Sequence, residues 1–240
     1  MTFEEFIQAL KVKGINLSES QLAQYELYYK MLVDWNERVN LTAITDQEEV
    51  YLKHFYDSMM PLWVEELDLN NKTLIDIGAG AGFPSIPILI ANPTMHVTIV
   101  DSLNKRINFL KELTDALNLS DRVNLVHGRA EDVGQDKQYR GKFEIATARA
   151  VANMNVLSEY CMPMVAKGGY FVALKGAKAQ EEVDAAKGAI STLGGKIEHV
   201  HTEELPGDEG ERSVVLIKKT LDTPNKYPRK AGKPTKQPIK

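Results

Sequence analysis

A glycine-rich turn is the first part of the sequence whose residue types suit ligand binding. Gly78, Gly80 and Gly82 alternate with alanines directly after an apolar segment, and Pro84 follows two residues later. Glycines at this spacing permit a tight turn and let a ligand approach the backbone where a Cβ atom would collide. A proline suits the first turn of a following helix. The pattern therefore predicts a strand, a ligand-binding loop and a helix that includes Phe83.

Two carboxylates accompany the turn. Asp76 precedes it, and Asp101 closes the next apolar segment, nineteen residues after Gly82. A carboxylate at a second strand end can bind ribose hydroxyls, and one at the first strand end can meet a cationic amino-acid group. NAD enzymes use G-x-G-x-x-G at this place, but here the third glycine comes one residue early and little chain remains for a separate substrate domain. NAD binding and a purely structural turn are the less favoured alternatives.

Alternating strand-like and helical segments surround this turn. The segments 196–204 and 213–218 end the series as two strand-like stretches joined by a Gly/Pro/acidic loop, which predicts an antiparallel hairpin. The earlier alternation predicts a parallel sheet covered on both faces. The expected strands are 73–77, 96–100, 123–126, 143–147 and 170–174, and the expected helices are 83–91, 104–117, 155–165 and 179–192.

The first 70 residues read as helices. Thr2 with Glu5 and Ser18 with Gln21 have the form of capping boxes. A third helix is expected from Asp46, with Glu49 as its box partner, until Pro61 disrupts it. We therefore expect an N-terminal helical extension over 1–70, an α/β domain over 71–219 and a tail over 220–240.

Charge is distributed unevenly along the chain. The net charge is −4, yet residues 218–240 contain eight basic residues, among them Arg229 and Lys230, against the single acid Asp222. Four prolines and many lysines predict that the tail is flexible when unbound. Such a tail either contacts RNA phosphates or promotes solubility. On charge alone the two interpretations are equally supported.

Composition places the chain among cytoplasmic proteins. The hydrophobic fraction of 43% and charged fraction of 26% are ordinary for a globular domain. The single cysteine, Cys161, excludes an internal disulfide and indicates a reducing compartment. No secretory leader or membrane-spanning segment is visible. We expect a cytoplasmic monomer without a metal ion.

The glycine turn, the two carboxylates and the terminal hairpin together resemble class I (Rossmann-like) S-adenosylmethionine-dependent methyltransferases. The resemblance implies an α/β fold with a seven-stranded, mostly parallel sheet whose last strand pair is antiparallel. It also implies that adenosine binds beside the exit of the third strand, where Ala130 and Glu131 lie. A surface carboxylate without a ligand is the alternative for Glu131.

The end of the fourth strand bears on the methyl acceptor. Amine methylases resemble one another in an Asn/Asp-Pro-Pro-Tyr/Phe motif there, but this chain has Thr147-Ala148-Arg149-Ala150. Methylation at pyrimidine C5 needs a cysteine nucleophile, and Cys161 is expected to be buried within a helix. The acceptors left open include guanine N7, which attacks through an in-plane lone pair and needs orientation more than a base. Arg149 is placed to hold guanine O6 or a phosphate.

Short segments along nearly the whole chain resemble the bacterial 16S rRNA guanine-N7 methyltransferases, also called the glucose-inhibited division protein B family. They are Asn40–Ile44, His54–Ser58, Asp76–Pro84, Asp101–Arg106, Arg149-Ala150, Ala173–Gly176 and Tyr227–Gly232.

This resemblance implies methyl transfer from S-adenosylmethionine to N7 of one guanosine in 16S rRNA. It implies cofactor contacts at Gly78, Phe83, Ala130, Glu131 and Arg149, with Arg149 near the reacting centre. Two rival functions stay open, a non-catalytic RNA-binding module that senses S-adenosylmethionine and a small-molecule methyltransferase. The candidate substrate-binding residues are His54, Asp57, Lys105, Arg106, Lys175, Arg229 and Lys230, and a structural hydrogen-bond pair is the alternative for His54 and Asp57.

Overall fold

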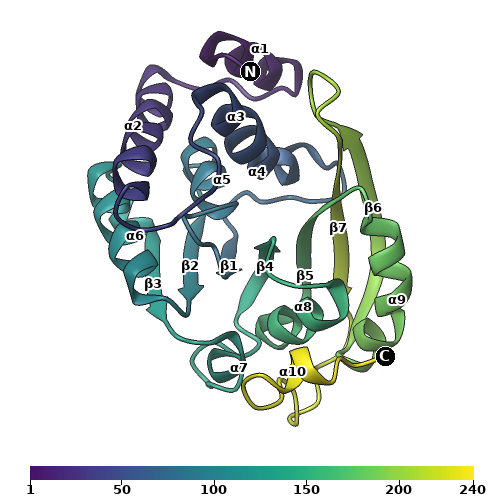
Figure 1. Cartoon of the computed structure of the whole chain (residues 1–240). Helices are drawn as coiled ribbons and strands as arrows, with labels where there is room; N and C mark the ends of the chain where they lie inside the picture. Colours follow the sequence, from purple (N-terminus) through teal and green to yellow (C-terminus); the bar gives the residue numbers. More distant parts are fainter.

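A computed structural model describes all 240 residues and places a seven-stranded sheet at the centre of the molecule (Figure 1). The strand order is β3-β2-β1-β4-β5-β7-β6. Strands β1 to β5 pair in parallel, whereas β7 pairs antiparallel with both β5 and β6. The strands are β1 (Thr73–Ile77), β2 (His96–Asp101), β3 (Val123–His127), β4 (Phe143–Arg149), β5 (Val165–Gly176), β6 (Gly195–Glu204) and β7 (Glu211–Lys219).

This topology confirms the predicted mostly parallel sheet with an antiparallel pair at its end. The connections from β1 run outward through β2 to β3, and those from β4 run the other way through β5. The carboxyl ends of β1 and β4 therefore flank the point where the strand order reverses, which is where open α/β sheets bind ligands. The glycine turn follows β1 and Ala150 follows β4, so both lie at this point.

Helices cover both faces of the sheet (Figure 1). Several helices differ from the sequence-based expectation. The helix expected over 83–91 begins only at Ser85, with Pro84 as its N-cap, so Phe83 lies in the loop before it. The expected helix 155–165 ends early because Pro163, which has no N–H to donate, lies in a 3-10 turn (Met162–Met164) that leads into β5. A short helix after β3 was not expected. The helices that follow the N-terminal region are α5 (Ser85–Ala91), α6 (Asn104–Ala116), α7 (Ala130–Val133), α8 (Met154–Cys161), α9 (Ala179–Thr192) and α10 (Lys233–Lys236).

The N-terminal helices begin as the sequence predicts. Helices α1 (Phe3–Val12) and α2 (Glu19–Asn36) both start with complete capping boxes. Asp46 caps α3 (Gln47–Val50) by accepting from Glu49 N, without the returning side-chain bond of a full box. The chain continues through a π-helical stretch (Tyr51–Tyr56), α4 (Asp57–Met59) and a 3-10 turn (Met60–Trp63) that contains Pro61.

One hydrophobic cluster joins these N-terminal helices to the sheet. Phe6, Tyr25 and Phe55 belong to the same buried cluster as Ile86 and Leu110 from the α/β part of the chain. Aromatic rings dominate the contact, with Tyr25 and Phe55 centroids 5.3 Å apart. Because burial of aromatic rings contributes strongly to packing, these contacts fasten the π-helical stretch that carries His54 to the α/β part of the chain.

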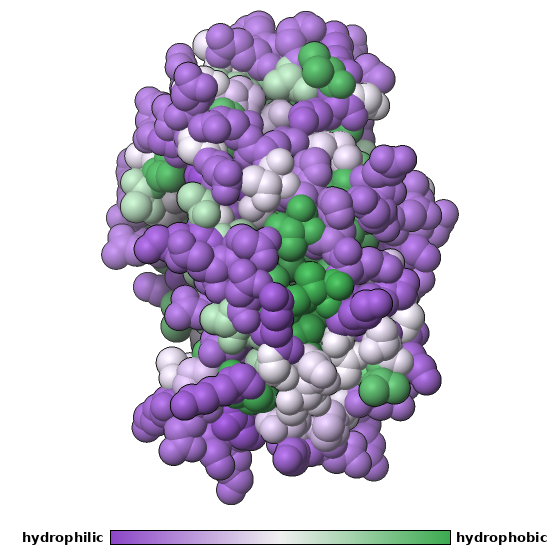
Figure 2. All heavy atoms as spheres, turned by 90° about the vertical axis from the view of Figure 1, so that its right-hand side faces the viewer, coloured by the Kyte–Doolittle hydropathy of each residue, from purple (hydrophilic) through white to green (hydrophobic).

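The β6 edge of the sheet is protected by charge. Strand β6 exposes Lys196, Glu198 and Glu204 at alternating positions, a pattern that disfavours pairing with another chain. The face that includes this edge is mainly hydrophilic, with its largest hydrophobic area near the centre and smaller hydrophobic spots elsewhere (Figure 2). None of the helices has the length and apolar character that a membrane span requires.

The C-terminal tail differs from the expectation of a flexible segment. Thr223 and Tyr227 are buried, and Arg140 donates hydrogen bonds to the carbonyl oxygens of both. Gln135 donates likewise to Pro228 O at 2.8 Å. These side chains from the α/β domain supply the backbone partners that a proline-rich segment cannot supply to itself. The tail is consequently packed beside α7 and α8 (Figure 1).

Candidate active site

Two adjoining cavities open at the carboxyl ends of the central strands. The first has a volume of about 320 Å³ and the second about 580 Å³. Ala150 and Val151, which follow β4, line both cavities and separate them. The remaining lining of the first cavity comprises Ile77, Gly78, Val100, Asp101, Ser102, Arg106, Gly128, Arg129, Ala130, Glu131 and Tyr160.

The three glycines of the turn have different surroundings. A Cβ atom at Gly80 would meet no atom within 4 Å, so this position borders open space, and its φ of +60° favours glycine. A Cβ atom at Gly82 would lie 2.8 Å from both Tyr28 Oη and Ile86 Cγ1. Gly82 thus serves the packing of the turn against the helices, whereas Gly78 and Gly80 remain accessible to a ligand. The expected role of Gly82 in cofactor contact has no geometric support.

Asp101 holds the glycine turn in addition to lining the first cavity. Its Oδ2 accepts a hydrogen bond from Gly80 N at 3.1 Å, and its Oδ1 accepts from Leu103 N at 2.9 Å. Arg106 Nη1 lies 3.5 Å from the same Oδ2. The carboxylate is 2% exposed. Asp101 therefore fixes the glycine turn and also lies where a carboxylate that binds ribose hydroxyls is expected.

Asp76 lies beneath the turn and lines neither cavity. Its side chain is fully buried, Oδ2 accepts from Ser85 N at 3.2 Å, and Oδ1 has no hydrogen-bond partner. Burial raises the pKa of this carboxyl to about 7, against the lowering effect of its bonds to Ser85. The expected direct contact with a cationic ligand group would require access to the unpartnered Oδ1, which the protein encloses.

Arg149 connects several residues that surround the second cavity. Its Nη1 donates to Asp57 Oδ2 at 2.6 Å and to Lys53 O at 3.0 Å, and its Nη2 lies 3.3 Å from His54 Nδ1. Its guanidinium carbon lies 5.0 Å from the centroid of the Phe83 ring. The structure thus brings Arg149 together with Asp57, His54 and Phe83, all of which the sequence analysis named as candidates.

His54 is neutral and has a defined tautomer. Burial, assisted by the Arg149 charge, lowers the pKa of His54 to about 3. Arginine can only donate, so Nδ1 must accept, and the proton is therefore on Nε2. Nε2 accordingly donates to Thr42 Oγ1 at 2.7 Å. The imidazole also stacks on Phe83 with a centroid separation of 4.6 Å, which fixes the plane of both rings.

Lys175 acts on the loop that separates the cavities. Its Nζ donates to Ala152 O and to Glu182 Oε2, both at 2.7 Å. Glu182 Oε2 also accepts from Met154 N at 2.9 Å. These contacts hold the loop so that Val151 packs over Gly78, where a Cβ atom would lie 2.9 Å from Val151 Cγ2. Lys175 lines the second cavity, as expected for a substrate-side residue, but its ammonium group is already paired.

The remaining candidates lie in three settings. Arg106 lines the first cavity, whereas Lys105 and Lys230 are exposed and line neither central cavity. Arg229 was expected to contact RNA, but its guanidinium pairs with the fully buried Glu159, with Nη2 to Oε2 at 2.6 Å. The buried carboxylate requires a cation, which explains why Arg229 turns inward.

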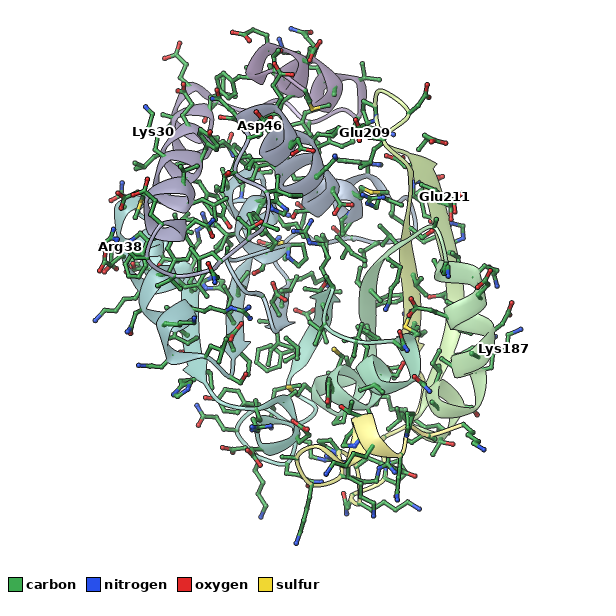
Figure 3. All side chains as sticks on the ribbon, in the orientation of Figure 1. Lys30, Arg38, Asp46, Lys187, Glu209 and Glu211 are labelled. Atoms are coloured by element: carbon green, nitrogen blue, oxygen red, sulfur yellow. The ribbon has the colours of Figure 1, made fainter.

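Sequence reasoning missed Arg212. This residue of β7 lines the second cavity, and its Nε lies 3.5 Å from Asp57 Oδ1. It stands in an ordinary strand pattern with no motif around it, so only the pairing of β7 with β5 brings it to the site. The hairpin loop before it also approaches the cavity, because Glu209 pairs with Lys53 at 3.1 Å, and Figure 3 shows Glu209 at the end of the hairpin nearest to the N-terminal helices.

The site fits a nucleoside cofactor with an amino-acid moiety. Both volumes fall in the range of small-molecule pockets, about 300–1,000 Å³. Gly80 leaves room beside the turn, Asp101 supplies a carboxylate, and Ala130 with Glu131 forms the far wall of the first cavity. No group of three His, Cys, Asp or Glu side chains is placed to bind a metal ion.

Comparison with known proteins supports one family. Residues 21–214 match the family described as rRNA small subunit methyltransferase G. The ribosomal RNA small subunit methyltransferase G of Bacillus subtilis is 55% identical over 239 residues, which cover 100% of this chain and 99% of that protein. The protein of the same name from Lactobacillus acidophilus is 56% identical over 240 residues, covering 100% of both chains.

Solved structures share the fold at low sequence identity. A candidate RNA methyltransferase of Pyrococcus horikoshii superposes with a TM-score of 0.53 at 14% identity, covering 81% of this chain and 100% of that one. The pyocyanin biosynthetic protein PhzM gives a TM-score of 0.54 at 17% identity, covering 70% and 56% of the two chains. These likenesses confirm the Rossmann-like methyltransferase fold.

Proposed function

The chain belongs to the rRNA small subunit methyltransferase G family, and on this premise we propose that it transfers a methyl group from S-adenosylmethionine to N7 of a guanosine in 16S rRNA. Membership in the family makes it an S-adenosylmethionine-dependent rRNA methyltransferase. The acceptor atom, the residue roles, a monomeric state and action in the cytoplasm on the small ribosomal subunit are parts of the proposal.

The first cavity is the proposed cofactor site. Gly78 and Gly80 would lie against the amino-acid side, Asp101 would accept from ribose hydroxyls, and Ala130 with Glu131 would border adenine. The bound cofactor supplies a methyl group on a positively charged sulfur, which a lone pair can attack directly. Phe83, expected to contact the cofactor, lines neither cavity. Its ring stacks on Tyr28 and on His54 and lies 5.0 Å from the Arg149 guanidinium carbon, so it supports the side chains of the second cavity.

The proposed acceptor atom rests on one observation: the titratable side chains of the second cavity that could act as a base are already paired or hydrogen-bonded. Asp57 is paired with Arg149, Glu182 is paired with Lys175, and neutral His54 has both ring nitrogens engaged. No side chain among these is available to remove a proton. Guanine N7 loses no proton on attack, so a site that orients without a base suits it.

Arg149 is the proposed orienting residue. A guanidinium fork can donate to guanine O6, which neighbours N7, or to a phosphate. Asp57 and His54 hold the guanidinium group at defined atoms, so their contribution is to position Arg149 before the RNA arrives. Arg149 would then align N7 with the transferred methyl group, and alignment alone can supply up to about 7–11 kcal/mol of the barrier reduction.

The test is methyl transfer from labelled S-adenosylmethionine into small ribosomal subunits from a strain deleted for this gene, with deproteinised 16S rRNA as a parallel arm. We expect label in N7-methylguanosine, and cleavage of the RNA at that nucleotide after borohydride and aniline treatment. Label in cytosine, adenine or ribose would overturn the acceptor. Cofactor binding without any transfer would favour the RNA-binding module, and transfer to small molecules alone would favour the small-molecule enzyme.

A further inference from the structure

The C-terminal segment, residues 223–240, packs against the wall of the first cavity. Figure 1 shows α10 of this segment beside α8 and near α7. Two residues that line the first cavity, Glu131 and Tyr160, each contact the segment directly. The segment therefore forms the outer layer of the cavity on the side of α7 and α8.

One ion pair anchors this segment. Glu159 is fully buried, and its Oε1 accepts from both the backbone N of Arg229 at 2.8 Å and the Nε at 2.9 Å. Its Oε2 accepts from Arg229 Nη2 at 2.6 Å. A buried carboxylate that loses its only cation is strongly unfavourable, so this bidentate contact adds to the Arg140 and Gln135 hydrogen bonds that hold the start of the segment.

The anchor lies next to two contacts with the cavity wall. Gly232, three residues after Arg229, donates its backbone N–H to Glu131 Oε1 at 3.0 Å. Tyr160, adjacent to Glu159, lies with its Oη 3.1 Å from Thr235 Oγ1. The Gly232 bond occupies one carboxylate oxygen of Glu131, and no hydrogen bond from the chain reaches the other, Oε2. Oε2 is therefore the oxygen of Glu131 that accepts nothing from the chain and is available to a ligand.

We propose that residues 223–240 are a structural wall of the cofactor cavity and that Arg229 is a positioning residue for cofactor binding, acting through the Gly232–Glu131 contact. This rests on the proposed binding of S-adenosylmethionine in the first cavity. It assigns to Arg229 a role distinct from RNA contact, since its guanidinium faces Glu159. The exposed lysines of the same segment remain available to contact RNA phosphates.

Calorimetric titration of the full-length protein with S-adenosylmethionine tests the proposal as a double-mutant cycle. Loss of a charge-assisted contact predicts about a tenfold weaker affinity for Glu131→Ala and for Arg229→Ala. In the Glu131→Ala background, Arg229→Ala should change affinity by less than about twofold, because coupled residues are not additive. The exposed neighbour Lys230→Ala is the matched control and should bind as wild type. An unchanged Arg229→Ala, or an equal loss in both backgrounds, would overturn the proposal.

A second variant separates positioning from stability. Arg229→Ala combined with Glu159→Gln removes the unpaired buried charge, so thermal stability should return toward wild type while cofactor affinity stays low. Recovery of both together would assign the pair to stability alone and overturn the proposal.

Amide hydrogen exchange without cofactor gives a readout that does not depend on the proposed function. Exchange in α7, which carries Glu131, should rise in Arg229→Ala and not in Lys230→Ala. Unchanged α7 protection would overturn the proposal even if wild type binds the cofactor. A wild type that binds no S-adenosylmethionine would overturn the proposed function, and with it the cofactor role of Arg229, while raised α7 exchange would still establish the wall contact.

Discussion

Arg149 Nη1 lies 2.6 Å from Asp57 Oδ2, although the two residues are separated by 92 positions in the chain. Asp57 begins α4 in the N-terminal helical region, and Arg149 ends β4 at the centre of the sheet. The pair therefore joins the N-terminal helices to the carboxyl ends of the strands. It follows that the second cavity exists only when these helices are docked.

The Arg149 contact predicts a loss of turnover on conservative replacement. Lysine keeps the charge but presents a single ammonium group, which cannot reach Asp57 and His54 together in a fork. Misplacement by about 1 Å can cost about a hundredfold in rate, and we expect a fall of that order for Arg149→Lys, measured as methyl transfer into small subunits. Cofactor affinity should stay within a few-fold if Arg149 acts on the base. Wild-type turnover in Arg149→Lys would remove its orienting role.

The open space at Gly80 predicts that a side chain there blocks the cofactor. Gly80→Val should abolish S-adenosylmethionine binding in calorimetry. Gly141→Val is a matched control, because Gly141 also has a left-handed φ, +64°, and open space around its Cβ position. Both variants carry similar backbone strain, but Gly80 N bonds to Asp101, which lines the first cavity, whereas Gly141 lines neither cavity. If Gly80→Val binds like the Gly141 variant, the glycine turn is not part of the cofactor site.

Asp101 is expected to bind the ribose as well as the turn. Asp101→Ala should lower cofactor affinity by about 1–3 kcal/mol. The ribose contribution can be isolated with a 2′-deoxy analogue of S-adenosylhomocysteine, whose missing hydroxyl should matter for wild type but not for the alanine variant. An equal penalty for the analogue in both proteins would limit Asp101 to fixing Gly80 and Leu103.

Neutral, buried His54 makes stability depend on pH. Its pKa is about 3 in the folded protein and about 6.5 when unfolded. The unfolded chain therefore takes up the proton as pH falls from about 6.5 toward 3, and this lowers the free energy of unfolding. His54→Gln lacks this titration. Denaturant unfolding at pH 7.5 and at pH 5 should show a smaller loss for His54→Gln than for wild type, and equal losses would mean that His54 is not held neutral.

The lysines of the C-terminal segment should carry the salt dependence of RNA binding. Each phosphate contact contributes about 0.7–0.9 to the slope of log affinity against log salt. A variant with alanine at Lys226, Lys230, Lys233 and Lys236 should lose up to about three units of slope while keeping its cofactor affinity. The control replaces four exposed lysines elsewhere and should retain the wild-type slope: Lys11, Lys30, Lys111 and Lys167. Equal slopes of log affinity against log salt in the two variants would mean that these lysines promote solubility and do not contact RNA.

The sequence by itself determined the family and most of the regular elements. Capping boxes at Thr2 and Ser18, the glycine turn after β1 and the alternation of apolar strands and helices are local patterns, readable without knowing any long-range contact. The hairpin of β6 and β7 was likewise predicted, because two strands without an intervening helix have few ways to pair.

Only the tertiary structure decided which candidates face a cavity. Asp76 and Gly82 have the residue types of ligand contacts, but packing encloses one and fills the space around the other. Arg229 turned inward because Glu159, seventy residues earlier, is a buried charge that needs a cation. The second cavity depends on strand order, which brings Arg212 beside Asp57. Such contacts are absent from local sequence patterns because they arise from burial and charge pairing between segments far apart in the chain.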